Sequence, residues 1–283
     1  MAYIYAFFMS IVAATAAAAI KFMGGSVSVV FITFWQFAIC LLVSMLVLWQ
    51  KGLAVTEVLA IKPADRSVMF IRGVSGLLGF YAFYLAIDNI PLIDATLLRH
   101  SSPLFVPIIA LVWLGVKTQA KTIAFIVLGF VGVYVTLRPD LSDINPYHLI
   151  GLSSALFLAL SMVSTNYLKA YDSAIVLFYY FLISFFGMLP FAIIQWQAIT
   201  VMEAMLIIYV GASIYIAMYL YNKAFTLSSA SVVAPMTYLS IVHAGLLDWL
   251  IWQYIPSWLS LVGMGMVVMC GLMTTLGGKQ KTS

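Results

Sequence analysis

Apolar runs of about twenty residues follow one another along nearly the whole chain, with only short polar breaks between them. A membrane-spanning helix needs about 20 predominantly apolar residues, so each run is long enough to cross a bilayer. The runs predict ten helices, at about 2–20, 29–49, 67–87, 92–115, 121–137, 148–168, 174–195, 203–223, 229–253 and 257–276. Only 8% of the 283 residues are charged and the mean hydropathy is +1.12, whereas soluble domains carry roughly 25% charged residues. The chain is therefore expected to be an all-α integral membrane protein.

The most polar connector, 138–147 (RPDLSDINPY), lies between the fifth and sixth runs. It divides the chain into a first five-helix unit (1–140), a connector (141–147), a second five-helix unit (148–278) and a tail (279–283). An odd number of helices per unit inserts the second unit upside down relative to the first, as in many secondary transporters. Few residues are identical between the units, so the prediction of two inverted five-helix repeats rests on hydropathy, helix number and charge placement.

Lysine and arginine are distributed unevenly over the loops that ten helices would create. If both termini are cytoplasmic, the cytoplasmic side receives Lys51, Lys62, Arg66, Arg72, Lys117, Lys121, Lys169, Lys223, Lys279 and Lys281. The other side receives Lys21 and Arg138, and Arg99 stays within the membrane. Cytoplasmic loops of membrane proteins carry the excess of Lys and Arg. We therefore expect a protein of the cytoplasmic (inner) membrane with both termini in the cytoplasm.

Several segments match the pattern of a known transporter family. They are 72–87 (RGVSGLLGFYAFYLAI), 90–105 (IPLIDATLLRHSSPLF), 128–139 (LGFVGVYVTLRP), 224–235 (AFTLSSASVVAP) and 255–258 (IPSW). With these segments the chain resembles an EamA-type member of the drug/metabolite transporter superfamily. The resemblance implies ten helices in two inverted repeats and transport of a small metabolite. The Gly-Glu pair that often ends helices four and nine in the family is replaced by Gly115–Val116 and Gln253–Tyr254, so any role of that glutamate is absent.

The fourth apolar run carries two ionisable residues, Arg99 and His100. An arginine at the bilayer centre costs about 2.5–3.5 kcal/mol on insertion scales, so such residues usually face a bundle interior or a watery cavity. Arg99 and Asp248 lie at similar depths, roughly 10 Å from the outer ends of their helices. We therefore expect them to meet, with Arg99 and His100 as substrate-binding candidates. The alternatives are a fixed structural salt bridge, or an Arg99 side chain that extends outward to water.

Asp248 and His243 are candidates for proton coupling. If a carboxylate of the cargo replaced Asp248 on Arg99, the freed Asp248 would favour protonation in a low-dielectric site. His243 would lie near the midplane, where a histidine can titrate near neutral pH. It could equally be a neutral, hydrogen-bonded residue of the core.

Two aromatic stripes occur at helical spacing. Tyr81 and Tyr84 share one face of the third run, and Tyr215, Tyr219 and Asn222 share one face of the eighth. Paired tyrosine stripes fit a cavity that orients a polar, partly cationic ligand through cation–π contacts and hydrogen bonds. Ordinary helix packing explains them equally well.

The sequence favours a secondary transporter over an enzyme. It contains no phosphate-binding glycine loop and no metal-ligand spacing, so we expect no cofactor, no bound metal and no nucleic-acid partner. The expected partners are a small-molecule substrate, the lipid bilayer and protons as coupling ion, with the protein a monomer or weak homodimer. Arg99 and the tyrosines favour an amino acid or an amino-acid-derived cargo, including one like S-adenosylmethionine. The alternatives are an organic-anion or carboxylate transporter and an integral-membrane enzyme acting on a lipid-linked substrate.

Overall fold

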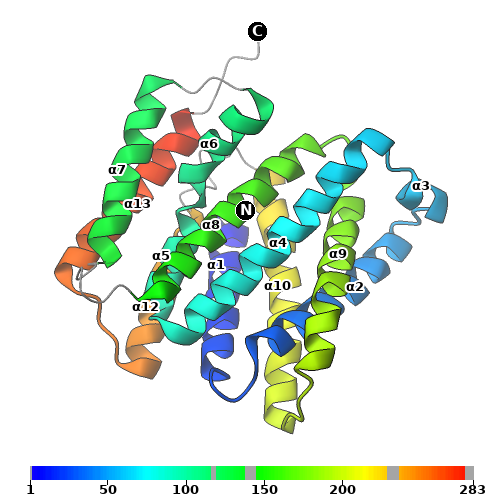
Figure 1. Cartoon of the computed structure of the whole chain (residues 1–283), viewed down its shortest axis with the longest axis horizontal. Coiled ribbons are helices and arrows are strands. Elements are labelled where there is room, and N and C mark those ends of the chain that lie inside the picture. The colour runs from blue at the N-terminus through cyan, green and yellow to red at the C-terminus, as the bar shows by residue number, and fades with distance from the viewer. Residues whose placement is uncertain (1, 116–118, 138–144, 228–235, 278–283) are drawn as a thin grey trace.

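The computed structural model describes residues 2–115, 119–137, 145–227 and 236–277, and within these ranges it contains helices and no strand (Figure 1). The helices are α1 (Ala2–Phe22), α2 (Val29–Gln50), α3 (Val55–Leu59), α4 (Pro63–Asn89), α5 (Leu92–His100), α6 (Ser102–Leu114), α7 (Ala120–Leu137), α8 (Pro146–Tyr167), α9 (Ser173–Ile194), α10 (Val201–Leu227), α12 (Leu239–Trp252) and α13 (Trp258–Gly277).

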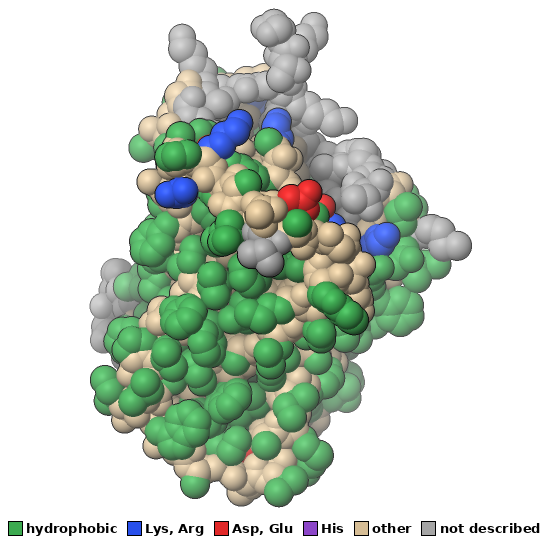
Figure 2. All heavy atoms as spheres, turned by 90° about the vertical axis from the view of Figure 1, so that its right-hand side faces the viewer, with side chains coloured by type: hydrophobic (Ala, Val, Ile, Leu, Met, Phe, Trp, Pro, Cys, Tyr) green, Lys and Arg blue, Asp and Glu red, His purple; other side chains and the backbone are tan. Residues whose placement is uncertain are grey.

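Eight segments of this structure are long and apolar enough to cross a membrane. They are Ala2–Phe22, Val29–Gln50, Pro63–Asn89, Leu92–Trp113, Pro146–Tyr167, Ser173–Ile194, Val201–Tyr221 and Trp258–Thr275, and the apolar helices α7 and α12 are shorter. Large apolar side chains such as Trp49, Val112 and Ile194 are about four-fifths exposed, as expected of lipid-facing positions. On the face in Figure 2, basic side chains gather at one end above a broad hydrophobic surface.

Several helix boundaries differ from the expected ones. The run at 92–115 forms two helices that meet at Ser101, because Pro103 has no backbone N–H to continue the hydrogen-bond ladder. The break at 51–66 contains the short helix α3, and α4 begins at Pro63, where proline suits the first helical position. Of the run expected at 229–253, residues 229–235 lie outside the described part, and the helix α12 begins at Leu239.

Helix α4 lies at the centre of the described packing. It packs along α8 and α9, while α1 packs along α10, α2 along α9 and α7 along α13. The main core contains large side chains that are fully buried between these helices, among them Phe37 of α2, Tyr84 of α4 and Tyr180 and Phe181 of α9. This core surrounds the buried polar residues of the candidate site.

A second buried cluster closes one end of the molecule, where α2, α3 and α4 meet the turn between α8 and α9. Lys51 pairs there with Asp172 at 2.8 Å, and Tyr171 donates a hydrogen bond of 2.6 Å to Asp65. The Lys51 ammonium lowers the pKa of Asp172, whose carboxylate also caps α9 by accepting from Ala174 N. These contacts join the two halves of the chain at the end opposite the Lys21–Asp248 pair described below.

Two helices end with a residue in the left-handed region. Gly115 follows α6 with φ 66° and Gln253 follows α12 with φ 55°. Glycine adopts this conformation without steric cost, whereas a side chain makes it unfavourable. Both helices therefore end in the same backbone conformation, with glycine at one position and glutamine at the other.

Candidate functional site

Arg99 lies against α4, between the aromatic side chains of that helix. Its Nη1 donates a hydrogen bond of 3.0 Å to the carbonyl of Gly79. The guanidinium carbon lies 4.4 Å from the ring centre of Phe80 and 4.7 Å from that of Phe83. Ring faces attract cations, so these contacts partly offset the loss of water around the charge. Arg99 is therefore held inside the bundle, as expected, and does not extend outward to solvent.

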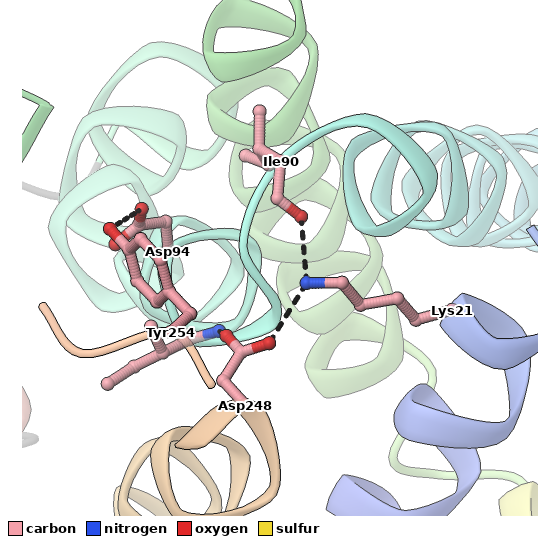
Figure 3. Close-up of polar contacts among 6 residues, drawn as sticks. Lys21, Ile90, Asp94, Asp248 and Tyr254 are labelled. Carbon is pink, nitrogen blue, oxygen red and sulfur yellow. Dashed lines mark hydrogen bonds and ion pairs between the residues drawn. The ribbon is translucent and has the colours of Figure 1, made fainter. Parts of the chain in front are cut away.

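The expected ion pair between Arg99 and Asp248 is wrong in this structure. Asp248 is fully buried, and its Oδ1 pairs with Nζ of Lys21 at 2.9 Å, as Figure 3 shows. Its Oδ2 accepts from the backbone N–H of Ile93 at 2.7 Å, and Lys21 also donates to the Ile90 carbonyl at 3.4 Å. Lys21 stands in the last turn of α1, within reach of α12, whereas Arg99 turns toward α4.

The Lys21–Asp248 pair belongs to a larger polar cluster that joins α1, α5 and α12. Nζ of Lys21 lies 4.7 Å from the ring centre of Trp252. Tyr254, just after α12, donates through its hydroxyl to Asp94 at 3.3 Å, as drawn in Figure 3. Asp94 is buried in the first turn of α5. We name Lys21, Asp94, Asp248 and Tyr254 the clasp, because their contacts connect three helices at one end of the bundle.

Arg72 is the functional candidate that the sequence analysis missed. It is 7% exposed, it donates a hydrogen bond to Ser161 of α8, and its guanidinium carbon lies 4.1 Å from the ring centre of Tyr180 of α9. From its place in the sequence, Arg72 was expected among the basic residues of the cytoplasmic side. Its signal in the sequence is the spacing R-G-x-x-G (72–76), since Gly76 leaves room for the arginine and for Tyr180, and Gly73 leaves room for Ile183.

Of the two predicted tyrosine stripes, one member lies beside the arginines. Tyr84 is fully buried, donates to Oε1 of Gln36 and contacts the Phe80 ring that Arg99 covers, at 5.8 Å between ring centres. Tyr81 is half-buried and packs against the core.

The stripe on α10 lies differently. The half-buried Tyr215 is 6.2 Å from Phe181 between ring centres, whereas Tyr219 is 53% exposed and has Nζ of Lys223 5.9 Å from its ring centre. The side chain of Asn222 lies outside the described part of the structure. The structure therefore brings Arg72, Arg99 and Tyr84 into one region and leaves Tyr219 at the surface.

Each histidine candidate faces a serine of another helix. Nε2 of His100 lies 2.6 Å from Oγ of Ser240 on α12, and Nδ1 of His243 lies 3.2 Å from Oγ of Ser10 on α1. Neither contact involves a carboxylate. His100 thus points toward α12 while its neighbour Arg99 points toward α4, so the two adjacent residues connect to different parts of the bundle.

Two further features of the described residues bear on the site. No group of three His, Cys, Asp or Glu side chains that could hold a metal ion is found among them. A groove of about 650 Å³ lies between α12 and α13, lined by apolar side chains such as Ile241, Val242, Leu261 and Met264. Because this groove contains none of the charged candidates, we place the candidate site at the two arginines and the buried aromatic side chains around them.

Comparisons with known proteins agree with this architecture. The pseudopaline exporter CntI of Pseudomonas aeruginosa (strain UCBPP-PA14) is 27% identical over 84% of this chain and 82% of its own length. The S-adenosylmethionine uptake transporter of Rickettsia bellii is 25% identical over 79% of this chain and 77% of its own, and the riboflavin transporter of Brucella anthropi is 22% identical over 81% of each.

A solved crystal structure shares the fold, with a TM-score of 0.65 and 17% identity over 100% of this chain and 98% of that one. The model of the EamA-like transporter family matches residues 1–138 and 145–276. This chain is therefore an integral membrane protein that belongs to the EamA-like transporter family.

Proposed function

We propose that this protein is a secondary active transporter that moves a small polar metabolite across the cytoplasmic membrane by alternating access. The observation that carries the proposal is that two arginines lie inside the bundle: Arg72 is buried against α8 and α9 of the second half, and Arg99 is half-buried against α4. Charged residues at membrane depth are costly and commonly mark substrate paths. The relatives named as transporters support transport rather than an enzymatic reaction.

The proposed architecture is ten spans in two inverted five-helix repeats, 1–140 and 148–278. The family model matches two segments, 1–138 and 145–276, which supports two units of one kind. Corresponding helices of the two halves also make corresponding contacts. The third long helix of the first half, α4, packs on α8 and α9, the first two helices of the second half. Its counterpart α10 packs on α1 and α2, the first two helices of the first half. The left-handed residues Gly115 and Gln253, which stand 138 positions apart, support the same relationship.

Alternating access requires an end of the bundle that can open and close. The clasp is a suitable element, since Lys21, Asp94 and Asp248 come from α1, α5 and α12, and their polar contacts connect the ends of these helices. With both termini in the cytoplasm, the clasp lies at the outer end. We propose that it closes the outer end in the present conformation and that protonation of Asp248 releases Lys21.

The residues alone are compatible with two classes of cargo. One is an amino acid or amino-acid-derived compound, including one like S-adenosylmethionine, and the other is an organic anion. The names of the relatives cover an exported pseudopaline, S-adenosylmethionine and riboflavin, so the family leaves the cargo open. Arg99 supports a carboxylate on the cargo in both classes.

Counterflow tests the proposal. Proteoliposomes containing the purified protein are loaded with an unlabelled polar-metabolite extract and placed in a dilute ¹³C-labelled extract. A transporter should accumulate at least one labelled compound transiently above its equilibrium level, and the Arg99→Gln variant should not. Equal label in wild-type, variant and protein-free liposomes would contradict the proposal.

A further inference from the structure

Arg72, which is buried, and Arg99, which is half-buried, share one property: no described carboxylate pairs with them. All seven Asp and Glu residues of the described ranges have other partners. Glu57 accepts from Ala54 N, Asp65 from Tyr171, Asp88 from Gly25 N, Asp94 from Tyr254, Asp172 from Lys51, Glu203 from Thr200 and Asp248 from Lys21.

The groups that do surround the arginines are neutral. Arg72 has the Ser161 hydroxyl and the Tyr180 ring, and Arg99 has the Gly79 carbonyl and the rings of Phe80 and Phe83. These contacts use only part of the donors of two guanidinium groups, each of which has five N–H bonds.

Two buried N–H donors of the same region lack a hydrogen-bond partner, as does the buried hydroxyl of Tyr180, whose ring lies against Arg72. The two N–H donors are Nε of Arg72 and Nε2 of Gln36, a fully buried residue whose Oε1 accepts from Tyr84. An unsatisfied buried donor costs about 1–3 kcal/mol, so such donors usually have a partner in some functional state. Both are complementary to an acceptor such as a carboxylate oxygen.

The backbone of α4 brings the two guanidiniums close to each other. A Cβ added at Gly76 would lie 2.9 Å from Nη1 of Arg72, and Arg99 donates to the carbonyl of Gly79. Positions 76 and 79 are neighbours on one face of a helix, about one turn apart. The contacts of the two guanidinium groups with α4 therefore lie about one helical turn apart.

We infer that Arg72 and Arg99 together form a binding site for a cargo with two carboxylate groups, one for each guanidinium. This inference rests on the proposed transport function and names its substrate class. In the present conformation the aromatic rings cover the guanidiniums, and a carboxylate takes the place of the Tyr180 ring on Arg72. A cargo with a single carboxylate and a cationic group fits less well, because its cation would meet two positive charges and no described carboxylate.

Matched pairs of compounds test the inference by thermal shift on the purified protein. Glutamate is compared with glutamine, and succinate with its monoamide succinamate, so that each pair differs by one carboxylate at nearly constant size. We expect the compound with two carboxylates to half-saturate the protein at about one tenth of the concentration that its partner needs, or at a lower one. A charge-assisted hydrogen bond in a buried site implies a difference of this size. In Arg72→Gln and in Arg99→Gln, the two members of a pair should half-saturate at similar concentrations, so that the ratio of these concentrations is close to one.

Arg66→Gln is the matched control. Arg66 lies on the same helix, but it donates to the Ile61 carbonyl outside the site, so this variant should keep the wild-type ratio. If Arg72→Gln does not fold, Arg72→Lys keeps the charge without the planar fork and should lower the ratio without abolishing it.

Three results would overturn the inference: equal binding of both members of each pair to wild type, no binding of any of the four compounds, or an unchanged ratio in both glutamine variants. Counterflow without a two-acid preference would refute this inference and leave the transport proposal intact. A preference for the two-acid compounds without counterflow of any compound would refute the transport proposal and leave the two-carboxylate binding site intact.

Discussion

Lys21 and Asp248 form an ion pair of 2.9 Å although they are 227 positions apart in the chain. The pair is asymmetric, because the side chain of Asp248 is fully buried and that of Lys21 is 15% exposed. Asp248 also accepts from Ile93 N, so a single carboxylate connects α1, α5 and α12. The behaviour of this pair decides how firmly the three helices are held together.

Removing either partner should destabilise the protein, and removing Lys21 should cost more. Lys21→Met leaves a buried, unpaired carboxylate, a situation that costs about 3–5 kcal/mol. Asp248→Asn still accepts from Ile93 N and leaves a lysine that can reach water, so its cost should be smaller. The double variant should recover part of the loss. Thermal unfolding in detergent measures all three, and additive effects of the single changes would show that the two residues do not interact.

Asp248 should also determine how transport responds to a pH gradient. If protonation of Asp248 opens the clasp, Asp248→Asn mimics the protonated form permanently. Counterflow should then continue in this variant, while an imposed pH gradient no longer drives accumulation. His243→Asn serves as a comparison, since its ring faces Ser10 and lies apart from the clasp. Normal gradient-driven accumulation by Asp248→Asn would show that the coupling proton binds elsewhere.

Gln253→Gly should stabilise the protein. Gln253 has φ 55°, which is unfavourable for a residue with a side chain, and glycine removes that cost at the price of a more flexible unfolded chain. The net gain should be up to about 1 kcal/mol. Gln253→Ala is the control, because it removes the 3.3 Å bond from Nε2 to the Leu250 carbonyl but keeps the Cβ. A stabilisation of equal size in the alanine variant would contradict the explanation from backbone conformation.

The helices of this fold follow directly from the sequence, because apolar runs of sufficient length have few alternatives in a membrane. The place of Arg99 inside the bundle was predicted for the same reason, whereas the run at 92–115 was expected to form one helix and is divided at Ser101. The partner of Asp248 was not predicted, since matching depth along two helices says nothing about the direction in which each side chain points. Arg99 turns to α4, and Lys21, which had been assigned to the outer side, reaches Asp248 instead.

Arg72 was missed for a different reason. Counting basic residues assigns each one to a side of the membrane, and an arginine near the beginning of a run is then treated as a loop charge. The structure shows α4 beginning at Pro63, which places Arg72 more than two turns inside the helix. Gly76 makes space for it, but this role becomes clear only when Tyr180 and Ser161 of the other half are in place.

Cysteine labelling tests the proposed orientation. A single cysteine at Lys62, before α4, should react with a membrane-impermeant maleimide only after the cells are opened. A cysteine at Gly25, after α1, should react in intact cells. The native residues Cys40 and Cys270 are buried and free, so they contribute little background. The reverse accessibility at both positions would place the clasp at the cytoplasmic end.

Cross-linking across the clasp tests alternating access most directly. Cysteines replace Phe22, beside Lys21 on α1, and Trp252, the ring next to Lys21 on α12, and a short bis-methanethiosulfonate joins them. If this end must open in every transport cycle, the cross-linked protein should lose counterflow and regain it when the linker is reduced. Counterflow at the same rate with and without the cross-link would contradict the account.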